Sequence, residues 1–309
     1  MTHSRSHMFA AYGLGATLYM PVIHPKVPDI VSARVAAPAS SIVLCLEDAL
    51  REEDVERGVR TLMDLLTDRV RDQETRPRLF IRPRSYDMAC RLRAIRGIDR
   101  IDGFVIPKAR LETLPEWISL LNGTRLCLMP TMETPDLFDP TRLTQFRDLL
   151  LTAGPERIAA VRIGGNDLLG AMALRRVRGV TAYDGPLAWF LSMAAGLLIP
   201  SGVSVTAPVF DIIDDLETLQ REVDRDVQMG FVSKTAIHPI QVPVIEGALA
   251  VAAEEVAAAE AIVNRDARAV FQIGGVMCEP ATHTAWAHRI LARKSCFGST
   301  VPLFRSVSE

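Results

Sequence analysis

The chain contains eight short apolar runs, most of which are broken by a proline, a glycine or an acidic residue. The runs occupy residues 17–22, 41–46, 78–82, 103–108, 126–132, 161–163, 202–206 and 230–239. They show little apolar–polar alternation, which is typical of strands buried on both faces of a parallel sheet. Stretches with helical periodicity separate the runs, which recur at intervals of roughly 25 to 40 residues. The pattern therefore predicts an α/β protein with a (β/α)8 TIM barrel, in preference to an open doubly wound sheet.

The length of 309 residues is ordinary for one α/β barrel, and no long linker divides the chain. We expect the barrel to cover residues 14–240. Residues 241–309 are interpreted as a helical C-terminal extension that packs on the barrel or on a neighbouring subunit. Within it, the Ala-rich residues 248–261 are interrupted by three glutamates, which fits a helix with one face in water.

Composition excludes several classes of protein. Lys and Arg number 35 against 37 Asp and Glu, so the chain carries no broad basic surface for a nucleic acid. The first residues are polar and no apolar run is long enough to span a bilayer, so we expect neither a signal peptide nor a membrane segment. The five cysteines form no CxxC pair, and we expect reduced thiols in a cytoplasmic protein.

Two acidic residues follow buried runs in the middle of the chain. Glu133 comes directly after the run 126–132, and Asp167 comes after 161–163 and two glycines. Because parallel strands place their carboxyl ends at one face of a barrel, both carboxylates are expected to meet in one site. Two oxygen ligands with room left for water and substrate suit Mg²⁺. The alternatives are a polar loop residue for Glu133 and a helix N-cap for Asp167.

Further charged residues lie at the ends of other runs. They are Glu47, Asp48, Arg82, Arg84, Lys108, Lys234 and His238. The set offers cations for an anionic substrate and carboxylates that could orient them. Each also has a structural interpretation: Glu47 and Asp48 as acids in the first turn of a helix, the arginines and Lys108 as ion-pair partners. For Lys234 and His238, packing or hydrogen bonding at the barrel rim is at least as well supported as catalysis.

Six motifs in the same order resemble the citrate lyase beta subunit / HpcH–HpaI aldolase superfamily. They are Leu44-Cys45-Leu46-Glu47-Asp48-Ala49, Ile81-Arg82-Pro83-Arg84, Val105-Ile106-Pro107-Lys108, Met132-Glu133-Thr134-Pro135, Gly164-Gly165-Asn166-Asp167-Leu168 and Gly230-Phe231-Val232-Ser233-Lys234-Thr235-Ala236-Ile237-His238-Pro239. The resemblance spans roughly residues 14 to 292. The early Leu14-Gly15-Ala16-Thr17-Leu18-Tyr19-Met20-Pro21 is most similar to a sub-branch of predicted C–C bond lyases of tellurite-resistance-type operons.

The resemblance implies a lyase or aldolase that cleaves or forms a carbon–carbon bond beside a carbonyl in a small carboxylated or oxo-acid substrate, through a metal-stabilised enolate. It implies Mg²⁺ held by Glu133 and Asp167, and Arg82 on the substrate carboxylate or the developing enolate. It also implies a homo-oligomer, a trimer or a hexamer. Positive charge beside the carbonyl oxygen would stabilise the charge that develops there, and Arg suits a bidentate grip on a carboxylate.

The remaining site residues are assigned from their position at the strand ends. Gly164 and Gly165 are expected to let the backbone approach the substrate and to offer N–H donors, and Lys108 to add a cation. A metal-bound water, Glu47 or Asp48 is expected to move the proton.

The sequence departs from the family pattern at three places. Cys45 stands where an acid is usual, Gly15-Ala16 where Arg-Ser is usual, and Thr206-Ala207 where strand seven usually ends in an acid. The arginine often holds a coenzyme A phosphate, so a citramalyl- or malyl-CoA type of thioester lyase is the less favoured alternative. A non-catalytic ligand-binding barrel in a stress-response assembly is a further one.

Overall fold

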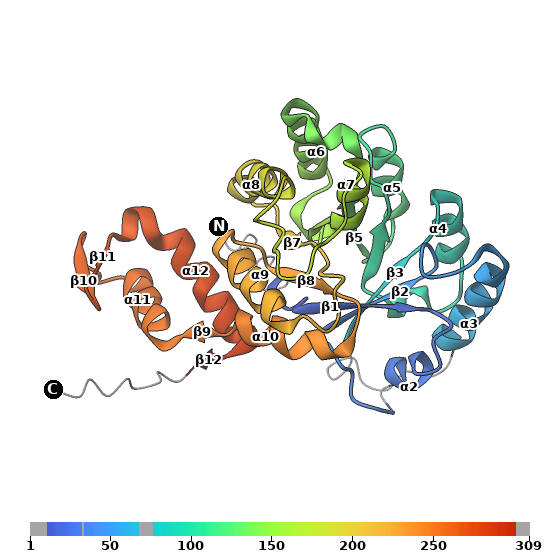
Figure 1. The fold of residues 1–309 in the computed structure, drawn as a ribbon, viewed down its shortest axis with the longest axis horizontal. Helices are drawn as coiled ribbons and strands as arrows, with labels where there is room; N and C mark the ends of the chain where they lie inside the picture. The colour runs from blue at the N-terminus through green and yellow to red at the C-terminus, as the bar shows by residue number, and fades with distance from the viewer. Residues whose placement is uncertain (1–10, 33, 68–76, 301–309) are drawn as a thin grey trace.

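The computed structural model describes residues 11–32, 34–67 and 77–300, and its centre is a closed barrel of eight parallel strands (Figure 1). The strands are β1 (Ala16–Pro21), β2 (Ser41–Cys45), β3 (Arg78–Arg82), β4 (Gly103–Ile106), β5 (Cys127–Met132), β6 (Val161–Ile163), β7 (Val205–Ala207) and β8 (Ser233–Ala236). Neighbours in sequence pair in order, and β8 closes on β1. The predicted (β/α)8 barrel is confirmed, with each strand at or next to one of the eight apolar runs.

Helices surround the barrel and bury their apolar faces against the strands. They are α2 (Val27–Val31), α3 (Val55–Thr67), α4 (Tyr86–Arg93), α5 (Leu114–Leu120), α6 (Pro140–Thr152), α7 (Gly165–Ala171), α8 (Leu187–Leu198), α9 (Leu216–Gln228) and α10 (Val242–Leu249). Ser85 caps α4, since its hydroxyl accepts a hydrogen bond from the Met88 N–H. A 3₁₀ turn (Glu52–Asp54) precedes α3, and residues 68–76 lie outside the described part.

The barrel interior changes character along the strands. Near the amino ends, Thr17, Ser41 and Ser233 hydrogen-bond to one another at 2.9 to 3.0 Å. An apolar plug follows, which includes Leu14, Val43, Phe80, Val105 and Met129. Towards the carboxyl ends the inward side chains become polar and charged. The apolar plug therefore closes the lower end of a polar cavity that opens at the carboxyl face.

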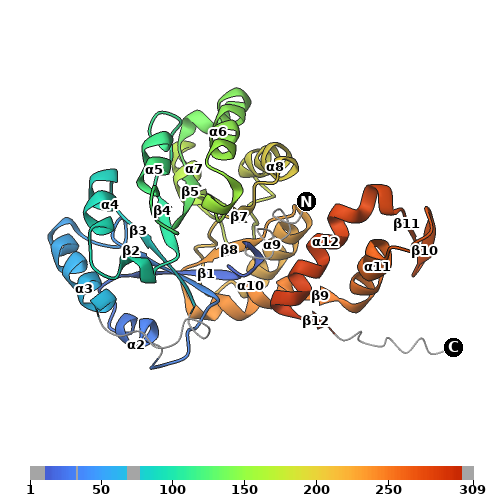
Figure 2. The same ribbon diagram turned by 180° about the vertical axis from the view of Figure 1, so that it is seen from behind.

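The C-terminal segment forms a second, smaller unit beside the barrel, as Figures 1 and 2 show from opposite sides. It contains β9 (Val251–Ala252), α11 (Ala253–Val263), β10 (Phe271–Ile273), β11 (Val276–Cys278), α12 (Pro280–Phe297) and β12 (Ser299–Thr300). α11 and α12 enclose their own apolar cluster. α10 precedes this unit and buries Val242, Ile245 and Leu249 in the barrel core, so the separate core begins at Val251.

Side chains from α12 tie this unit to the barrel. Arg293 donates to the Leu249 and Ala250 carbonyls at 3.2 and 3.1 Å, and Arg289 donates to the Gly230 carbonyl. None of the helices in the described residues is long and apolar enough to cross a membrane.

Candidate active site

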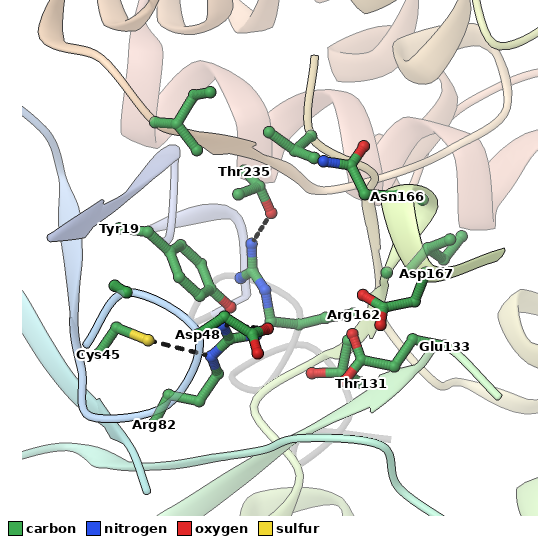
Figure 3. Close-up of a pocket in the computed structure, with 16 residues that line it drawn as sticks. Tyr19, Cys45, Asp48, Arg82, Thr131, Glu133, Arg162, Asn166, Asp167 and Thr235 are labelled. Carbon is green, nitrogen blue, oxygen red and sulfur yellow. Dashed lines mark hydrogen bonds and ion pairs between the residues drawn. The ribbon is translucent and has the colours of Figure 1, made fainter. Parts of the chain in front are cut away.

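A cavity of about 330 Å³ opens at the carboxyl ends of the barrel strands, above the apolar plug (Figure 3). Its polar lining comes from many strands of the barrel: Tyr19, Cys45, Asp48, Arg82, Thr131, Glu133, Arg162, Asn166, Asp167 and Thr235. This volume lies at the lower end of the range for small-molecule sites, roughly 300 to 1,000 Å³. The face and the size both suit a site for a small substrate.

Glu133 follows β5 directly, and its carboxylate is buried at the edge of the cavity. Its Oε1 accepts a hydrogen bond of 2.6 Å from the Lys108 backbone N–H. Lys108 adopts the left-handed φ of +46°, uncommon for a residue with a side chain, which marks a sharp turn after β4. Burial, with the nearby charge of Asp167, raises the pKa of Glu133 to about 7 although the Lys108 N–H opposes this shift.

Asp167 lies in the first turn of α7, which begins two residues after β6. Gly164 and not Asp167 occupies the N-cap position, so the capping alternative does not describe this structure. In Figure 3 the Asp167 carboxylate lies beside that of Glu133, and both line the cavity. The structure thus brings together the two acids that the sequence analysis singled out.

The donor set fits Mg²⁺. Within the described ranges no three His, Cys, Asp or Glu side chains gather closely enough to hold a metal, so the protein offers a pair of carboxylates. Mg²⁺ is commonly held by one or two carboxylates, with waters and substrate completing its shell. The pKa of Glu133 is raised mainly by burial and to a smaller extent by the charge of Asp167, and a divalent cation would favour the ionised carboxylate. The Thr131 hydroxyl, buried in the same cavity, has no hydrogen-bond partner.

Arg82 ends β3 and is held by two acids from the loop after β2. Its Nη2 lies 2.8 Å from Glu47 Oε2 and 3.2 Å from Asp48 Oδ2, and its Nε donates to Cys45 Sγ at 3.3 Å. Burial raises the pKa of Glu47, although Arg82 opposes the shift. Asp48 lines the cavity and is more than half exposed. Both acids therefore fix the orientation of the guanidinium, and Cys45 contributes a thiol where the family usually has an acid.

Two predicted substrate contacts are corrected by the structure. The Gly164 N–H donates to the Met132 carbonyl at 2.9 Å, so it is not available to a substrate. What Gly164 contributes is space, since a Cβ there would lie 2.3 Å from Glu133 Oε2. The Lys108 side chain is half-exposed and lies outside the cavity lining, with its Nζ 3.5 Å from Glu47 Oε1. Lys108 contributes to the site through its backbone N–H, which donates to Glu133. Gly164 and Gly165 both line the cavity.

Arg162 is the charged residue that the sequence analysis missed. It points inward from β6, is 1% exposed, and donates to the Thr235 hydroxyl. Its guanidinium lies 5.2 Å from the centre of the Tyr19 ring, and that of Arg82 lies 5.4 Å from the same centre. One signal was available: a charged residue between Val161 and Ile163 in a run predicted to be buried.

Lys234 and His238 take structural positions. Lys234 points away from the cavity, with Nζ 2.8 Å from Glu222 Oε1 and 2.9 Å from Asp226 Oδ2, both on α9. His238 caps the 3₁₀ turn Pro239–Gln241 by accepting a hydrogen bond from the Ile240 N–H. Arg84 also stays outside the cavity and donates to the carbonyls of Leu46, Glu47 and Leu50, which shapes the loop that carries Glu47.

A larger cavity of about 650 Å³ adjoins the first and shares Tyr19 and Ile237 with it. Its wall includes His24, Lys26 and His238. Gly15, where an arginine is usual, lies before the amino end of β1, and a Cβ there would lie 2.7 Å from Glu246 Oε1. The position that lacks the arginine therefore lies at the opposite end of the barrel from both cavities.

Comparisons with known proteins agree with this architecture. The family described as C–C bond lyase of the TIM-barrel fold matches residues 8–299. Among solved structures, protein CitE from Mycobacterium tuberculosis in complex with magnesium, acetoacetate and coenzyme A is 23% identical, with 91% of this chain and 98% of that chain covered and a TM-score of 0.65. No curated protein matches the chain.

Two further solved structures share the fold. A citrate lyase from Burkholderia xenovorans LB400 is 17% identical over 94% of each chain, with a TM-score of 0.71. The citrate lyase beta subunit from M. tuberculosis, complexed with oxaloacetate and magnesium, is 22% identical with a TM-score of 0.57 and covers 77% of this chain and 98% of that one.

Proposed function

The chain belongs to the C–C bond lyase family of the TIM-barrel fold, and from this premise we propose a Mg²⁺-dependent, citrate lyase-like lyase or aldolase that acts on a small carboxylated or oxo-acid substrate. One observation carries the proposal: a single cavity at the carboxyl face is lined by Glu133, Asp167 and Arg82. Similar structures were obtained with magnesium and oxaloacetate or acetoacetate, which supports the same chemistry here. A homo-oligomer, trimer or hexamer, is part of the proposal.

The reaction class requires that negative charge be stabilised beside a carbonyl. When the carbon–carbon bond of a β-hydroxy acid breaks, its electron pair moves to the carbonyl oxygen of one fragment, and the hydroxyl proton of the other fragment is lost as its new carbonyl forms. Glu133 and Asp167 would hold Mg²⁺, which when bound supplies positive charge at the oxygen that becomes negative. Arg82 adds a second positive group that is already oriented before substrate arrives.

The residues around Arg82 set that orientation. Glu47 and Asp48 hold the guanidinium by ion pairs of 2.8 and 3.2 Å, so that Arg82 binds a carboxylate or an enolate oxygen without first having to order its side chain. Of the two acids, Asp48 lines the cavity and is the better placed to take and return the proton. The buried Glu47 acts through Arg82.

Metal binding is the first test. Glu133→Gln and Asp167→Asn remove one charge each with little change in volume, and each is expected to abolish Mg²⁺ binding in isothermal titration calorimetry. Glu260→Gln, on an exposed acid of α11 paired with Lys294, is the matched control and should bind Mg²⁺ as the unsubstituted protein does. Unchanged Mg²⁺ binding in both site variants would overturn the metal assignment.

Enolate chemistry is tested separately. With Mg²⁺ and D₂O, the protein should exchange the methyl protons of pyruvate for deuterium, as followed by proton NMR, because protonation of the enolate is reversible. Arg82→Gln should slow the exchange at least about 100-fold, the effect typical of losing one group that stabilises developing charge. Mg²⁺ binding without any exchange would contradict the enolate mechanism and leave the metal site standing.

A thioester lyase of the citramalyl- or malyl-CoA type is the second candidate, favoured by the adjoining 650 Å³ cavity and its cationic Lys26. Calorimetry with coenzyme A and with free oxo-acids separates the two candidates. Binding of coenzyme A that is weakened by Lys26→Gln would favour the thioester, whereas binding of oxo-acids alone would favour the free acid.

A further inference from the structure

We propose that Arg162 binds a second anionic group of the substrate, so that the site selects an oxo-acid or hydroxy acid that carries two carboxylates. The inference rests on the proposed function, because it assigns the first carboxylate or enolate to Arg82 and the metal site. It adds a specificity residue on β6 and a substrate class.

The first observation is that Arg162 has no ion-pair partner among the described residues. Among the described residues no carboxylate lies within ion-pair distance of its guanidinium, and its neighbours are the Thr235 and Tyr19 hydroxyls, the Tyr19 ring and Met129 Sδ at 3.7 Å. A guanidinium carries five N–H donors, which these neutral groups do not saturate. Arg82, in the same cavity, has two carboxylates.

The second observation is that Arg162 is buried yet lines the cavity. Only 1% of its surface is exposed, and burial lowers the pKa of its guanidinium. Arg nevertheless keeps its charge at neutral pH. A buried charge without a partner is costly and is ordinarily compensated by an ion pair. Among the described residues the charge of Glu133 acts on Arg162 only from beyond ion-pair distance, so an anion from a ligand in the cavity can supply the direct partner.

Tyr19 does not supply the missing charge. Burial raises the pKa of its phenol, although Arg162 and Arg82 oppose the shift, so the hydroxyl stays protonated at neutral pH. The centre of its ring lies 5.4 Å from the Arg82 guanidinium and 5.2 Å from the Arg162 guanidinium. Both guanidinium groups therefore lie against Tyr19 and line the same cavity, where a ligand with two anionic groups can reach both (Figure 3).

The third observation is a polar group without a partner in the same space. The Thr131 hydroxyl is buried, lines the cavity and makes no hydrogen bond. β5 and β6 pair Thr131 with Arg162, so the hydroxyl and the guanidinium come from adjacent positions of the barrel wall. A carboxylate oxygen at this wall would satisfy both groups. The cavity of about 330 Å³ suits a short dicarboxylate.

Matched ligand pairs test the assignment by calorimetry with saturating Mg²⁺. 2-Oxoglutarate is compared with 2-oxopentanoate, and 2-oxoadipate with 2-oxohexanoate. The members of each pair differ by the terminal carboxylate. The two chain lengths place that carboxylate at two distances from the oxo-acid group. The unsubstituted protein should bind one dicarboxylate at least about tenfold more tightly than its monocarboxylate partner. Arg162→Gln should reduce that ratio to less than about threefold. Its affinities for Mg²⁺ and for the monocarboxylates should stay within about threefold of those of the unsubstituted protein.

Controls separate this inference from its premise and from misfolding. Arg91→Gln makes the same replacement at an exposed arginine of α4 and should keep the full preference. Thr235→Val removes the hydroxyl that holds Arg162 and should lower the dicarboxylate preference without removing the guanidinium. The ligand comparison on the unsubstituted protein stands even if Arg162→Gln does not fold.

Two results would overturn the inference. One is a protein that binds Mg²⁺ and monocarboxylates but prefers neither dicarboxylate. The other is an Arg162→Gln variant that loses affinity for both members of a pair equally, since Arg162 would then hold the first carboxylate. Failure to bind Mg²⁺ and any oxo-acid would instead contradict the proposed function.

Discussion

Two groups of charged residues lie on either side of the barrel wall, and they differ in how completely they are paired. The α9–β8 cluster consists of Arg176, Glu222, Asp226 and Lys234, with Tyr183. Glu222 accepts from Lys234, from Arg176 and from the Ala182 N–H, and Asp226 accepts from Lys234 and the Tyr183 hydroxyl. Every carboxylate oxygen of this cluster has a donor from the protein, although the buried Arg176 Nε has no hydrogen-bond partner.

The site on the inner side of the wall is left incomplete. Arg162 has no carboxylate partner among the described residues, the Thr131 hydroxyl has no hydrogen bond, and the pKa of Glu133 is raised to about 7 by burial. The difference teaches that burial of charge alone does not mark a functional site. A saturated group stabilises the fold, whereas an unsaturated one facing a cavity is suited to receive a ligand.

The largest expected effect comes from breaking the saturated cluster. Lys234→Met leaves Glu222 and Asp226 without their shared cation in a buried place, since Lys234 is 1% exposed. Removing one partner of a buried ion pair typically lowers the free energy of unfolding by about 3 to 5 kcal/mol. Urea denaturation measures the loss, and Mg²⁺ affinity at a temperature where the variant is folded should be unchanged.

Lys294→Met is the matched control on a pair that is open to solvent. Lys294 Nζ lies 2.7 Å from Glu260 Oε1, and both side chains are exposed. An exposed ion pair contributes about 0 to 1 kcal/mol, so this variant should unfold close to the unsubstituted protein. Equal losses in the two variants would contradict the structural role of the α9–β8 cluster.

The sequence was sufficient for the barrel and for the two acids. Eight unalternating apolar runs ending in Pro, Gly or polar residues specify buried parallel strands, and residues directly after such strands must meet at the carboxyl face. Glu133 and Asp167 follow their strands closely, so their convergence is a consequence of topology.

The same sequence could not tell which side of a strand faces the cavity. Lys234 and Arg162 both lie within barrel strands, yet Lys234 points outward to α9 and Arg162 points inward. In a strand buried on both faces the apolar–polar alternation that would reveal the inward side is missing. The role of the Gly164 N–H was unpredictable for a related reason, because its donation to Met132 depends on the pairing of β5 with β6.

A smaller effect is expected from crowding the site through its backbone. In Gly164→Ala the new Cβ would lie 2.3 Å from both Cβ and Oε2 of Glu133, so the two chain segments must move apart. Overpacking of this kind costs about 1 to 3 kcal/mol, and the displaced carboxylate should weaken Mg²⁺ binding by about tenfold or more. Calorimetry and urea denaturation measure the two effects.

Gly170→Ala places the same substitution on α7, where no atom lies within 4 Å of the new Cβ. This control should leave Mg²⁺ affinity unchanged and raise helix stability by up to about 1 kcal/mol. Mg²⁺ affinity equal in Gly164→Ala and Gly170→Ala would mean that Glu133 does not need the space that Gly164 provides.

The smallest expected effect is a pH dependence of Mg²⁺ affinity at the incomplete site. Burial raises the pKa of Glu133 from 4.5 to about 7, so its proton competes with Mg²⁺ and the affinity should be roughly tenfold weaker at pH 6 than at pH 8.

Because the folded pKa is the higher one, the metal-free protein has this stability contribution in full below pH 4.5 and loses it as the pH rises through 7. Saturating Mg²⁺ should reverse that loss, and the loss should be smaller in metal-free Glu133→Gln, where only other buried acids such as Asp226, whose pKa burial raises to about 6, still contribute. Calorimetry in two buffers of different ionisation enthalpy counts the released proton, and equal Mg²⁺ affinities at pH 6 and pH 8 would show that Glu133 is already ionised before the metal binds.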